Sequence, residues 1–175
     1  MLEKRMYFFV PYQLTGIQKG IQCGHTVEQY AHKYKDDIEY VDFVENWMTW
    51  IILDGGSTNT NLDNPGTLNN IYYRLLENHI DCAWFYEPDL QDALTSVCFL
   101  CDERVFNREL YPDFYDFLNQ KGYSTQSYEF EKYLKTLSSD EILEKFPERY
   151  EEWIKSLGGL KNVFLRELIR GKRLA

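Results

Sequence analysis

The chain has 175 residues, a mass of 21.0 kDa and a net charge of −9 at pH 7, because 28 Asp and Glu outnumber 19 Lys and Arg. With 44% hydrophobic and 17% aromatic residues, its composition excludes an intrinsically disordered protein and fits one domain, with or without a small appendage. The negative charge excludes a protein that binds nucleic acid over its whole surface, since phosphate contacts need positive charge.

The first hundred residues alternate between runs typical of strands and runs typical of helices. Apolar, β-branched and aromatic runs predict strands at residues 6–11, 49–54, 82–86 and 95–101. Apolar residues at helical spacing predict helices at residues 18–34, at residues 38–47, and after Thr67, which we expect to be an N-cap. Gly20 and Gly24 lie four residues apart on the first helix, which predicts a close approach to a sheet or a ligand.

The residues after 104 follow a different pattern, with helices and no strands. Helical spacing predicts helices at residues 106–122, 128–137, 142–146, 148–157 and 160–170. Ser138 and Glu141 form a capping-box pattern at the start of the third of these helices. The sequence therefore predicts an α/β domain at residues 1–104, with a small mixed four-stranded sheet flanked by helices. A C-terminal helical extension at residues 105–175 is expected to pack on it.

Charge is distributed unevenly along the chain. Residues 155–175 contain six Lys and Arg against one Glu, a net charge of +5, so the rest of the chain carries −14. A basic tail on an acidic body is the local patch through which this chain would contact a nucleic-acid backbone.

Four cysteines are too few and too irregularly spaced for a disulfide scaffold. Cys98 and Cys101 have the spacing of a metal or redox motif, but on a strand they point to opposite faces, so we expect two buried thiols and no metal. No cofactor is expected. The first residues contain no apolar segment of secretory length, and no apolar run approaches the ~20 residues that span a bilayer, which predicts a cytoplasmic protein without membrane contact.

The loop and helix start at residues 16–25 carry the first candidate site. Gly16, Lys19 and Gly20 follow a predicted strand at the N-terminus of a helix, where free N–H groups, the helix dipole and a lysine favour an anion. The alternative is a close-packed helix start with a solvated lysine. His25 and His32 share a helical face with Glu28 between them, a pattern that suits metal binding or proton transfer along the helix. The alternative is that both are partly buried histidines with a structural role.

Two further segments place polar residues at strand ends. Asp54 and Gly55 end a predicted central strand, where open α/β sheets place their ligand-binding loops; the alternative is a simple turn. Glu87 and Asp89 flank Pro88 at the end of another strand and are candidates for a general base or a ligand anchor. A lone acidic loop would otherwise be solvated.

The run Gln22-Cys23-Gly24-His25 resembles the glutamine-cysteine-small-histidine signature of the type II peptidyl-tRNA hydrolases. The order of elements over residues 5–103 is also similar to that family, and the C-terminal helices lie outside it. The chain is similar to divergent members of the family found in bacteriophages. The resemblance implies that family's α/β fold and its activity, hydrolysis of the ester in peptidyl-tRNA.

The resemblance also implies roles for single residues. The family has an important lysine four residues before the signature glutamine; that position here is Gln18, and Lys19 follows one step later. One step is about 100° of helix rotation, so Lys19 replaces that lysine only if the helix start is reshaped. The family's catalytic acid, in the loop before the last strand, corresponds to Glu87 or Asp89, and its threonine corresponds to Thr95.

Three functions follow from these observations. The first is hydrolysis of peptidyl- or aminoacyl-tRNA, with Lys19 holding a phosphate or the developing oxyanion and Glu87 or Asp89 orienting a water. The second is non-catalytic capture of a small nucleotide or other anion, which in a phage would suit a counter-defence protein. The third is an interaction protein whose C-terminal helices hold a homodimer or a higher homo-oligomer, or bind a host partner. The residues expected to bind ligand are Gly16, Gln18, Gly20, Gln22, His25, Asp54 and Gly55.

Overall fold

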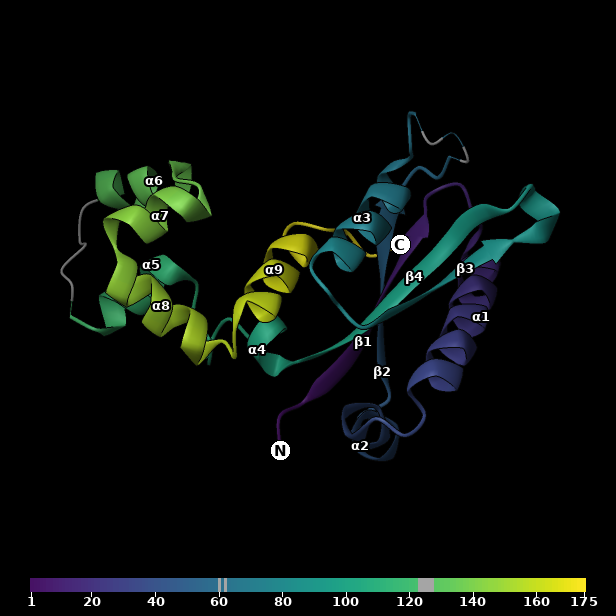
Figure 1. The fold of residues 1–175 in the computed structure, drawn as a ribbon, viewed down its shortest axis with the longest axis horizontal. Helices are drawn as coiled ribbons and strands as arrows, with labels where there is room; N and C mark the ends of the chain where they lie inside the picture. Colours follow the sequence, from purple (N-terminus) through teal and green to yellow (C-terminus); the bar gives the residue numbers. More distant parts are fainter. Residues whose placement is uncertain (60, 62, 123–127) are drawn as a thin grey trace. The chain divides into compact units, whose positions relative to one another are not determined.

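The computed structural model describes residues 1–59, 61, 63–122 and 128–175 (Figure 1). The chain divides into two compact units, one formed by Met1–Glu103 with Glu167–Ala175 and the other by Arg104–Arg166. The last nine residues, which were expected in the helical extension, thus cluster with the α/β unit.

A mixed four-stranded sheet forms the centre of the first unit, as predicted. Its strands lie in the order β2-β1-β4-β3; β1 and β2 are parallel, and the other two pairs are antiparallel. The strands are β1 (Lys4–Pro11), β2 (Thr49–Gly56), β3 (Cys82–Glu87) and β4 (Ala93–Asp102). The helices of this part of the chain are α1 (Gly16–Tyr34), α2 (Ile38–Asn46), α3 (Thr67–Glu77) and a 3-10 turn, Pro88–Leu90.

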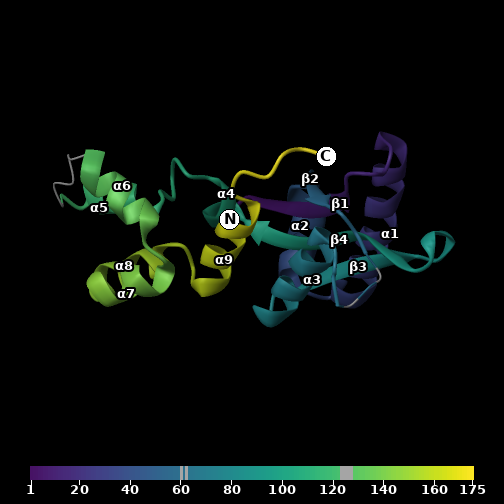
Figure 2. The same ribbon diagram turned by 90° about the horizontal axis from the view of Figure 1, so that it is seen from above.

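Helices cover both faces of the sheet (Figures 1 and 2). Alternate residues of β1, among them Phe8, pack with α1 and α2 on one face. Tyr7 and Phe9 point to the other face, where Tyr7 stacks on Phe99 and Leu68 of α3 lies against Gly55. The core of the α1 face contains Met6, Phe8, Val10, Cys23, Tyr30, Phe43, Ala83 and Cys98.

Two expectations about local structure were wrong. A Cβ built on Gly20 or Gly24 meets nothing within 4 Å, so neither glycine is needed for close packing of α1. Thr67 is not the N-cap of α3. Gly66 holds that position, and the Thr67 hydroxyl accepts a hydrogen bond from the N–H of Ser57 at 2.7 Å, which ties the start of α3 to the end of β2.

The second unit is helical, and its capping box is confirmed. The Ser138 hydroxyl accepts from the N–H of Glu141, and the Glu141 carboxylate accepts from the N–H of Ser138. The helix predicted at residues 106–122 forms only over Phe114–Gln120; it begins after Pro112, because the residue before a proline is disfavoured in a helix. The helices after β4 are α4 (Glu103–Phe106), α5 (Phe114–Gln120), α6 (Tyr128–Thr136), α7 (Ser139–Lys145), α8 (Pro147–Ser156) and α9 (Leu160–Ile169).

The C-terminal residues cover the outer edge of β2. The N–H of Asp54 donates to Arg173 O at 2.9 Å, and the N–H of Ala175 donates to Ile52 O at 3.0 Å. Leu53 and Leu174 form an antiparallel bridge between these bonds. The tail thus satisfies backbone groups that an edge strand would otherwise leave to solvent.

Lys4 joins the start of β1 to α2. Its buried ammonium donates to the carboxylate of Asp42 and lies 3.2 Å from that of Glu39. Burial tends to lower the pKa of Lys4, but the hydrogen bonds to both carboxylates outweigh it and raise the pKa. The hydrogen bond from Lys4 holds the pKa of Asp42 below its usual 3.8.

We therefore expect Asp42 to contribute to the loss of stability in acid. A carboxyl whose pKa is lower in the folded chain stabilises the fold above its ordinary pKa, and this contribution is lost as the pH falls through the folded-state value. The Asp42→Asn variant should show a smaller loss of stability than the wild type below pH 3.8, measured by urea unfolding at a series of pH values. An identical pH dependence in both proteins would contradict this role. Asp36→Asn, at an exposed residue just before α2, is the control.

No helix in the described part of the chain is long and apolar enough to cross a membrane. All four cysteines are buried and free, as expected for core thiols.

Candidate active site

The strand directions bring several chain segments to one end of the sheet. β1 ends at Pro11, and α1 begins there after a four-residue loop. Because β4 runs antiparallel to both β1 and β3, its start lies at the same end as the last residues of those strands. The first turns of α1, the end of β3 and the start of β4 therefore meet on the α1 face of the sheet.

Three candidate residues from these segments form one chain of hydrogen bonds. The Thr95 hydroxyl donates to Gln22 Oε1 at 2.6 Å, and Gln22 Nε2 donates to Glu87 Oε2 at 2.6 Å. An ionised carboxylate only accepts hydrogen bonds, so Glu87 fixes the orientation of the Gln22 amide and thereby makes Thr95 the donor. Thr95 and Gln22 are buried, and Glu87 is half-buried.

A bulge in β4 explains how Thr95 reaches α1. Phe85 pairs with Ser96 and the next residue of β3 pairs with Leu94, which leaves Thr95 as an extra residue on β4. Val97, two residues after Thr95, points to the α3 face, and regular alternation would send Thr95 there too. The bulge instead turns the Thr95 hydroxyl toward Gln22, with a longer contact of 3.3 Å to Phe85 O.

Lys19 lies one helical turn before Gln22 on the side of α1 that faces the sheet. The buried residues of the helix are Gln22, Cys23, Thr26 and Tyr30, and at 100° per residue Lys19 falls in the middle of this stripe. It is half-buried, and its ammonium makes no hydrogen bond or ion pair with any residue that the structure describes. A lysine beside the N-terminus of α1 can therefore attract an anion to this end of the sheet.

The start of α1 is not reshaped. The helix begins regularly at Gly16, and Thr15 and Gln18 form a capping box, with Gln18 Oε1 accepting from the N–H of Thr15 at 2.9 Å. Gln18 is exposed and engaged in this cap. Lys19 therefore does not take the position of Gln18; it lies on a different, sheet-facing side. The capping box was missed, although its Thr-x-x-Gln pattern is readable in the sequence.

His25 lies next to the hydrogen-bonded residues, against an aromatic ring that the sequence did not single out. Its imidazole stacks on Phe85 with ring centroids 4.6 Å apart. Phe85 lies on the α1 face of β3, two residues before Glu87, so the two side chains are on the same face of the strand. Strand alternation from Glu87 was the signal that could have identified it.

Other candidate residues lie apart from this chain of bonds. Asp54 is on β2, with β1 and β4 between it and β3; its Oδ1 accepts from the N–H of Gly56 at 2.7 Å and closes a turn. Gly55 serves packing, because a Cβ there would lie 2.8 Å from Leu68 and 3.1 Å from Val10 O. The remaining three candidates, Gly16, Gly20 and Asp89, are exposed. Of these, only Asp89 contacts a hydrogen-bonded residue of the site: its N–H lies 3.5 Å from Glu87 Oε1.

The described side chains offer neither a metal site nor a reactive thiol. No group of three or more His, Cys, Asp or Glu among them could hold a metal ion, and the row of His25, Glu28 and His32 is exposed. Burial raises the pKa of Cys23, which lies beside Gln22, to about 12, so its thiol stays protonated. The described groups at this site are therefore the carboxylate of Glu87, the hydroxyl of Thr95, the amide of Gln22 and the ammonium of Lys19, with the imidazole of His25 beside them.

Comparison with known families finds no family model that matches the chain, and comparison with curated proteins finds no significant match.

Proposed function

We propose that the protein hydrolyses the ester that joins a peptidyl or aminoacyl group to tRNA. The observation that carries this proposal is the bond chain from Thr95 through Gln22 to Glu87, with Lys19 on the same side of α1. A half-buried carboxylate held in one orientation by Gln22, with a lysine on the same side of α1 that has no partner among the described residues, suits water activation beside an anionic substrate. The resemblance of residues 22–25 to the signature of the type II peptidyl-tRNA hydrolases points to the same reaction.

Each group has a role in this reaction. Glu87 accepts a proton from a water as the water oxygen attacks the ester carbonyl. Lys19 and the N–H groups at the start of α1 stabilise the oxyanion or a neighbouring phosphate. The tetrahedral intermediate then collapses, the bond to the ribose oxygen breaks, and this oxygen takes the proton from Glu87 and leaves as a hydroxyl. Gln22 and Thr95 do not touch substrate in this scheme; they hold the carboxylate in position.

Release of the peptidyl group from a model N-blocked peptidyl-tRNA tests the proposal. We expect turnover by the wild type and a loss of about a hundredfold in Lys19→Ala, because one charge that stabilises the transition state is removed. Lys35→Ala, with the same charge change at the other end of α1, should retain activity. Absence of turnover by the folded wild type would refute the proposal, and equal rates for the two variants would remove Lys19 from the mechanism.

A second candidate function is capture of a small nucleotide or another compact anion at the same helix start. Two basic residues of the C-terminal segment are already engaged: Arg166 is buried and paired with Asp113, and Arg170 is paired with Glu167. This leaves fewer cations for a long polyanion than the sequence suggests, which favours a compact ligand. A rise in Tm on addition of a nucleotide, without turnover of peptidyl-tRNA, would support capture.

A further inference from the structure

The two edges of the sheet are treated differently by the chain. β2 forms one edge, and residues 171–175 cover it with two backbone hydrogen bonds and a bridge. β3 forms the other edge, and no described strand or backbone segment pairs with its outer side. An exposed edge strand presents unpaired N–H and C=O groups that another extended chain can bind.

The registers show which groups of β3 are free. Successive residues of a strand direct their N–H and C=O groups alternately to its two sides. On β2, the backbone groups of Ile52 and Asp54 bind the C-terminal tail, so the backbone N–H and C=O groups of Leu53 point toward β1. By the same alternation, the odd-numbered residues of β1 direct their backbone groups toward β4, where their partners are odd-numbered residues. The even-numbered residues of β4 then face the odd-numbered residues of β3. The even-numbered residues of β3 therefore direct their backbone groups away from the sheet.

The side chains next to the edge agree with this assignment. Cys82 O accepts from Lys33 Nζ and from the hydroxyl of Tyr34, at 3.5 Å each, and both donors come from α1 outside the sheet. Further along, the outward backbone groups of Trp84 and Tyr86 have no such partner among the described residues. The free part of the edge therefore runs over residues 84–86.

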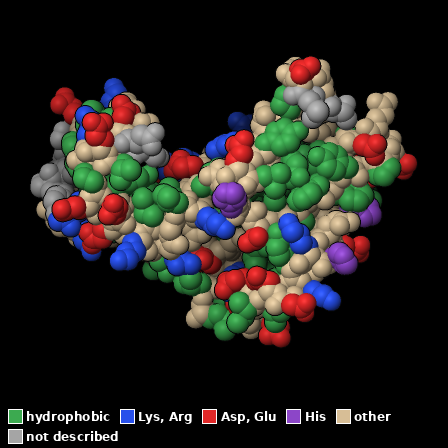
Figure 3. Space-filling model, viewed as in Figure 1, with side chains coloured by type: hydrophobic (Ala, Val, Ile, Leu, Met, Phe, Trp, Pro, Cys, Tyr) green, Lys and Arg blue, Asp and Glu red, His purple; other side chains and the backbone are tan. Residues whose placement is uncertain are grey.

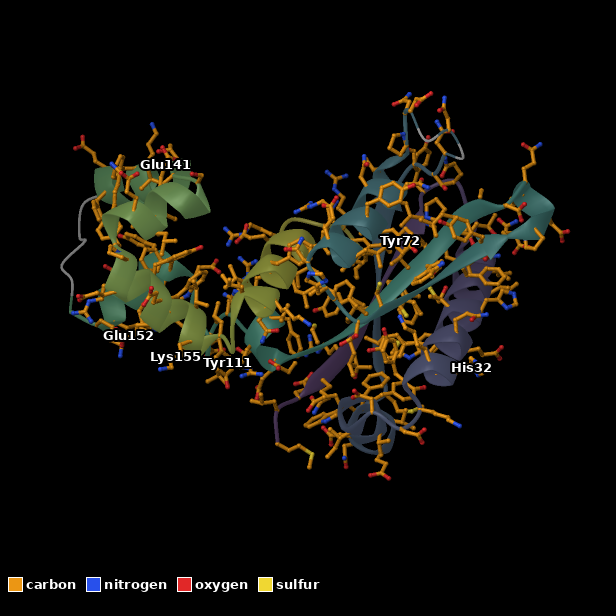
Figure 4. All side chains as sticks on the ribbon, in the orientation of Figure 1. His32, Tyr72, Tyr111, Glu141, Glu152 and Lys155 are labelled. Carbon is orange, nitrogen blue, oxygen red and sulfur yellow. The ribbon has the colours of Figure 1, made fainter. Side chains whose placement is uncertain are left out.

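Aromatic side chains flank this free segment on both faces. On the α3 face, the ring of Trp84 lies 4.8 Å from that of Tyr72, and Tyr86 is 39% exposed. Figure 3 shows hydrophobic side chains gathered over α3 and the neighbouring strands, and Figure 4 labels Tyr72 there. On the α1 face, the stacked pair of His25 and Phe85 borders the edge. An added strand would thus place its alternate side chains on aromatic surfaces.

We propose that the free edge of β3 binds an extended peptide segment of a partner protein, which adds a fifth strand to the sheet. The segment carries apolar side chains that point alternately to the two faces of the sheet, and it carries basic residues at the end that meets the β3–β4 turn. The carboxylates of Asp89 and Asp92 are exposed on that turn, so a basic flank is complementary in charge. A second copy fits less well, because antiparallel self-pairing centred on Trp84 places Asp81 opposite Glu87 of the other copy, and like charges there are destabilising.

A synthetic peptide, Arg-Arg-Val-Tyr-Val-Tyr-Val, tests this proposal without any tRNA. We expect its addition to ¹⁵N-labelled protein to shift the amide signals of Trp84 and Tyr86 more than those of Ile52 and Asp54, whose edge the tail covers. Two N-methylated forms of the peptide separate backbone pairing from side-chain contact. Methyl groups on alternate amides that face β3 should weaken binding roughly tenfold or more, and methyl groups on the other alternate amides should not.

Charge and surface variants complete the test. A peptide with Glu in place of both Arg should bind more weakly, and Tyr86→Ala should weaken binding while Tyr12→Ala, exposed but off the edge, should not. Absence of binding at concentrations up to about 1 mM, or equal affinity of the two N-methylated forms, would overturn the proposal. A concentration-dependent dimer that protects the Trp84 amide from exchange would overturn it in favour of a second copy.

Discussion

Replacing Glu87 with glutamine is expected to lower the rate of peptidyl-tRNA hydrolysis by about a hundredfold to a thousandfold, the usual contribution of a positioned general base. An amide of the same shape can still accept the hydrogen bond from Gln22, so the fold should remain intact while the capacity to take a proton is lost. Single-turnover release from N-blocked peptidyl-tRNA measures the rate, and thermal unfolding checks the fold.

Asp89→Asn is the matched control for this prediction. Asp89 lies two residues from Glu87, but its side chain is exposed and only its N–H contacts the Glu87 carboxylate, at 3.5 Å. Its activity should stay within about threefold of the wild type. If Asp89→Asn lost activity and Glu87→Gln did not, the general base would be Asp89 and the assignment to Glu87 would be wrong.

Replacing Asp113 with alanine is expected to lower the free energy of unfolding of the helical unit by about 3 kcal/mol, since it leaves a buried charge without its partner. Arg166 is 1% exposed; its guanidinium lies 2.7 Å from Asp113 Oδ1 and donates to Arg104 O at 2.8 Å. Asp113 is itself 27% exposed, which places the expected loss at the lower end of the usual range for buried pairs. Hydrogen exchange of the amides of α5 and α8 measures it.

Two controls define the origin of this effect. Arg108 pairs with the other oxygen of Asp113 at 2.9 Å but is 42% exposed, so Arg108→Ala should cost less than about 1 kcal/mol. The double variant Asp113→Leu with Arg166→Met should recover much of the lost stability, because it removes both charges and keeps apolar volume. A loss in the double variant equal to that in Asp113→Ala would show that the effect comes from packing rather than from the unpaired charge.

Much of the fold could be predicted from local pattern. Continuous apolar runs such as residues 49–54 and 95–101 became strands, because they are short, rich in β-branched and aromatic residues and bounded by turn signals. The capping box at Ser138 formed for an equally local reason. Thr67 shows the limit of this approach. Its hydroxyl was expected to cap its own helix, but it binds the N–H of Ser57, which a neighbouring strand end brings close.

The candidate site was predictable as a set of residues but not as an arrangement. Gln22, Glu87 and Thr95 were candidates from the sequence, together with Asp54 and Gly55. Nothing local separates these groups, because all of them are polar or small residues at or near an element end. Only the strand order shows that two strands, β1 and β4, separate Asp54 from β3, and only the packing around Gly55 shows that this glycine serves the core.

The sequence by itself determined the acidic, aromatic-rich composition, the mixed α/β pattern and the types of side chain available for chemistry, since these depend on neighbouring residues alone. The tertiary structure decided which of those side chains meet. Gln22 bonds to residues 65 and 73 positions away, and Thr95 reaches it only because β4 carries a bulge. It also decided that the C-terminal tail covers β2 and leaves β3 open, since edge exposure depends on strand order, which local pattern does not encode.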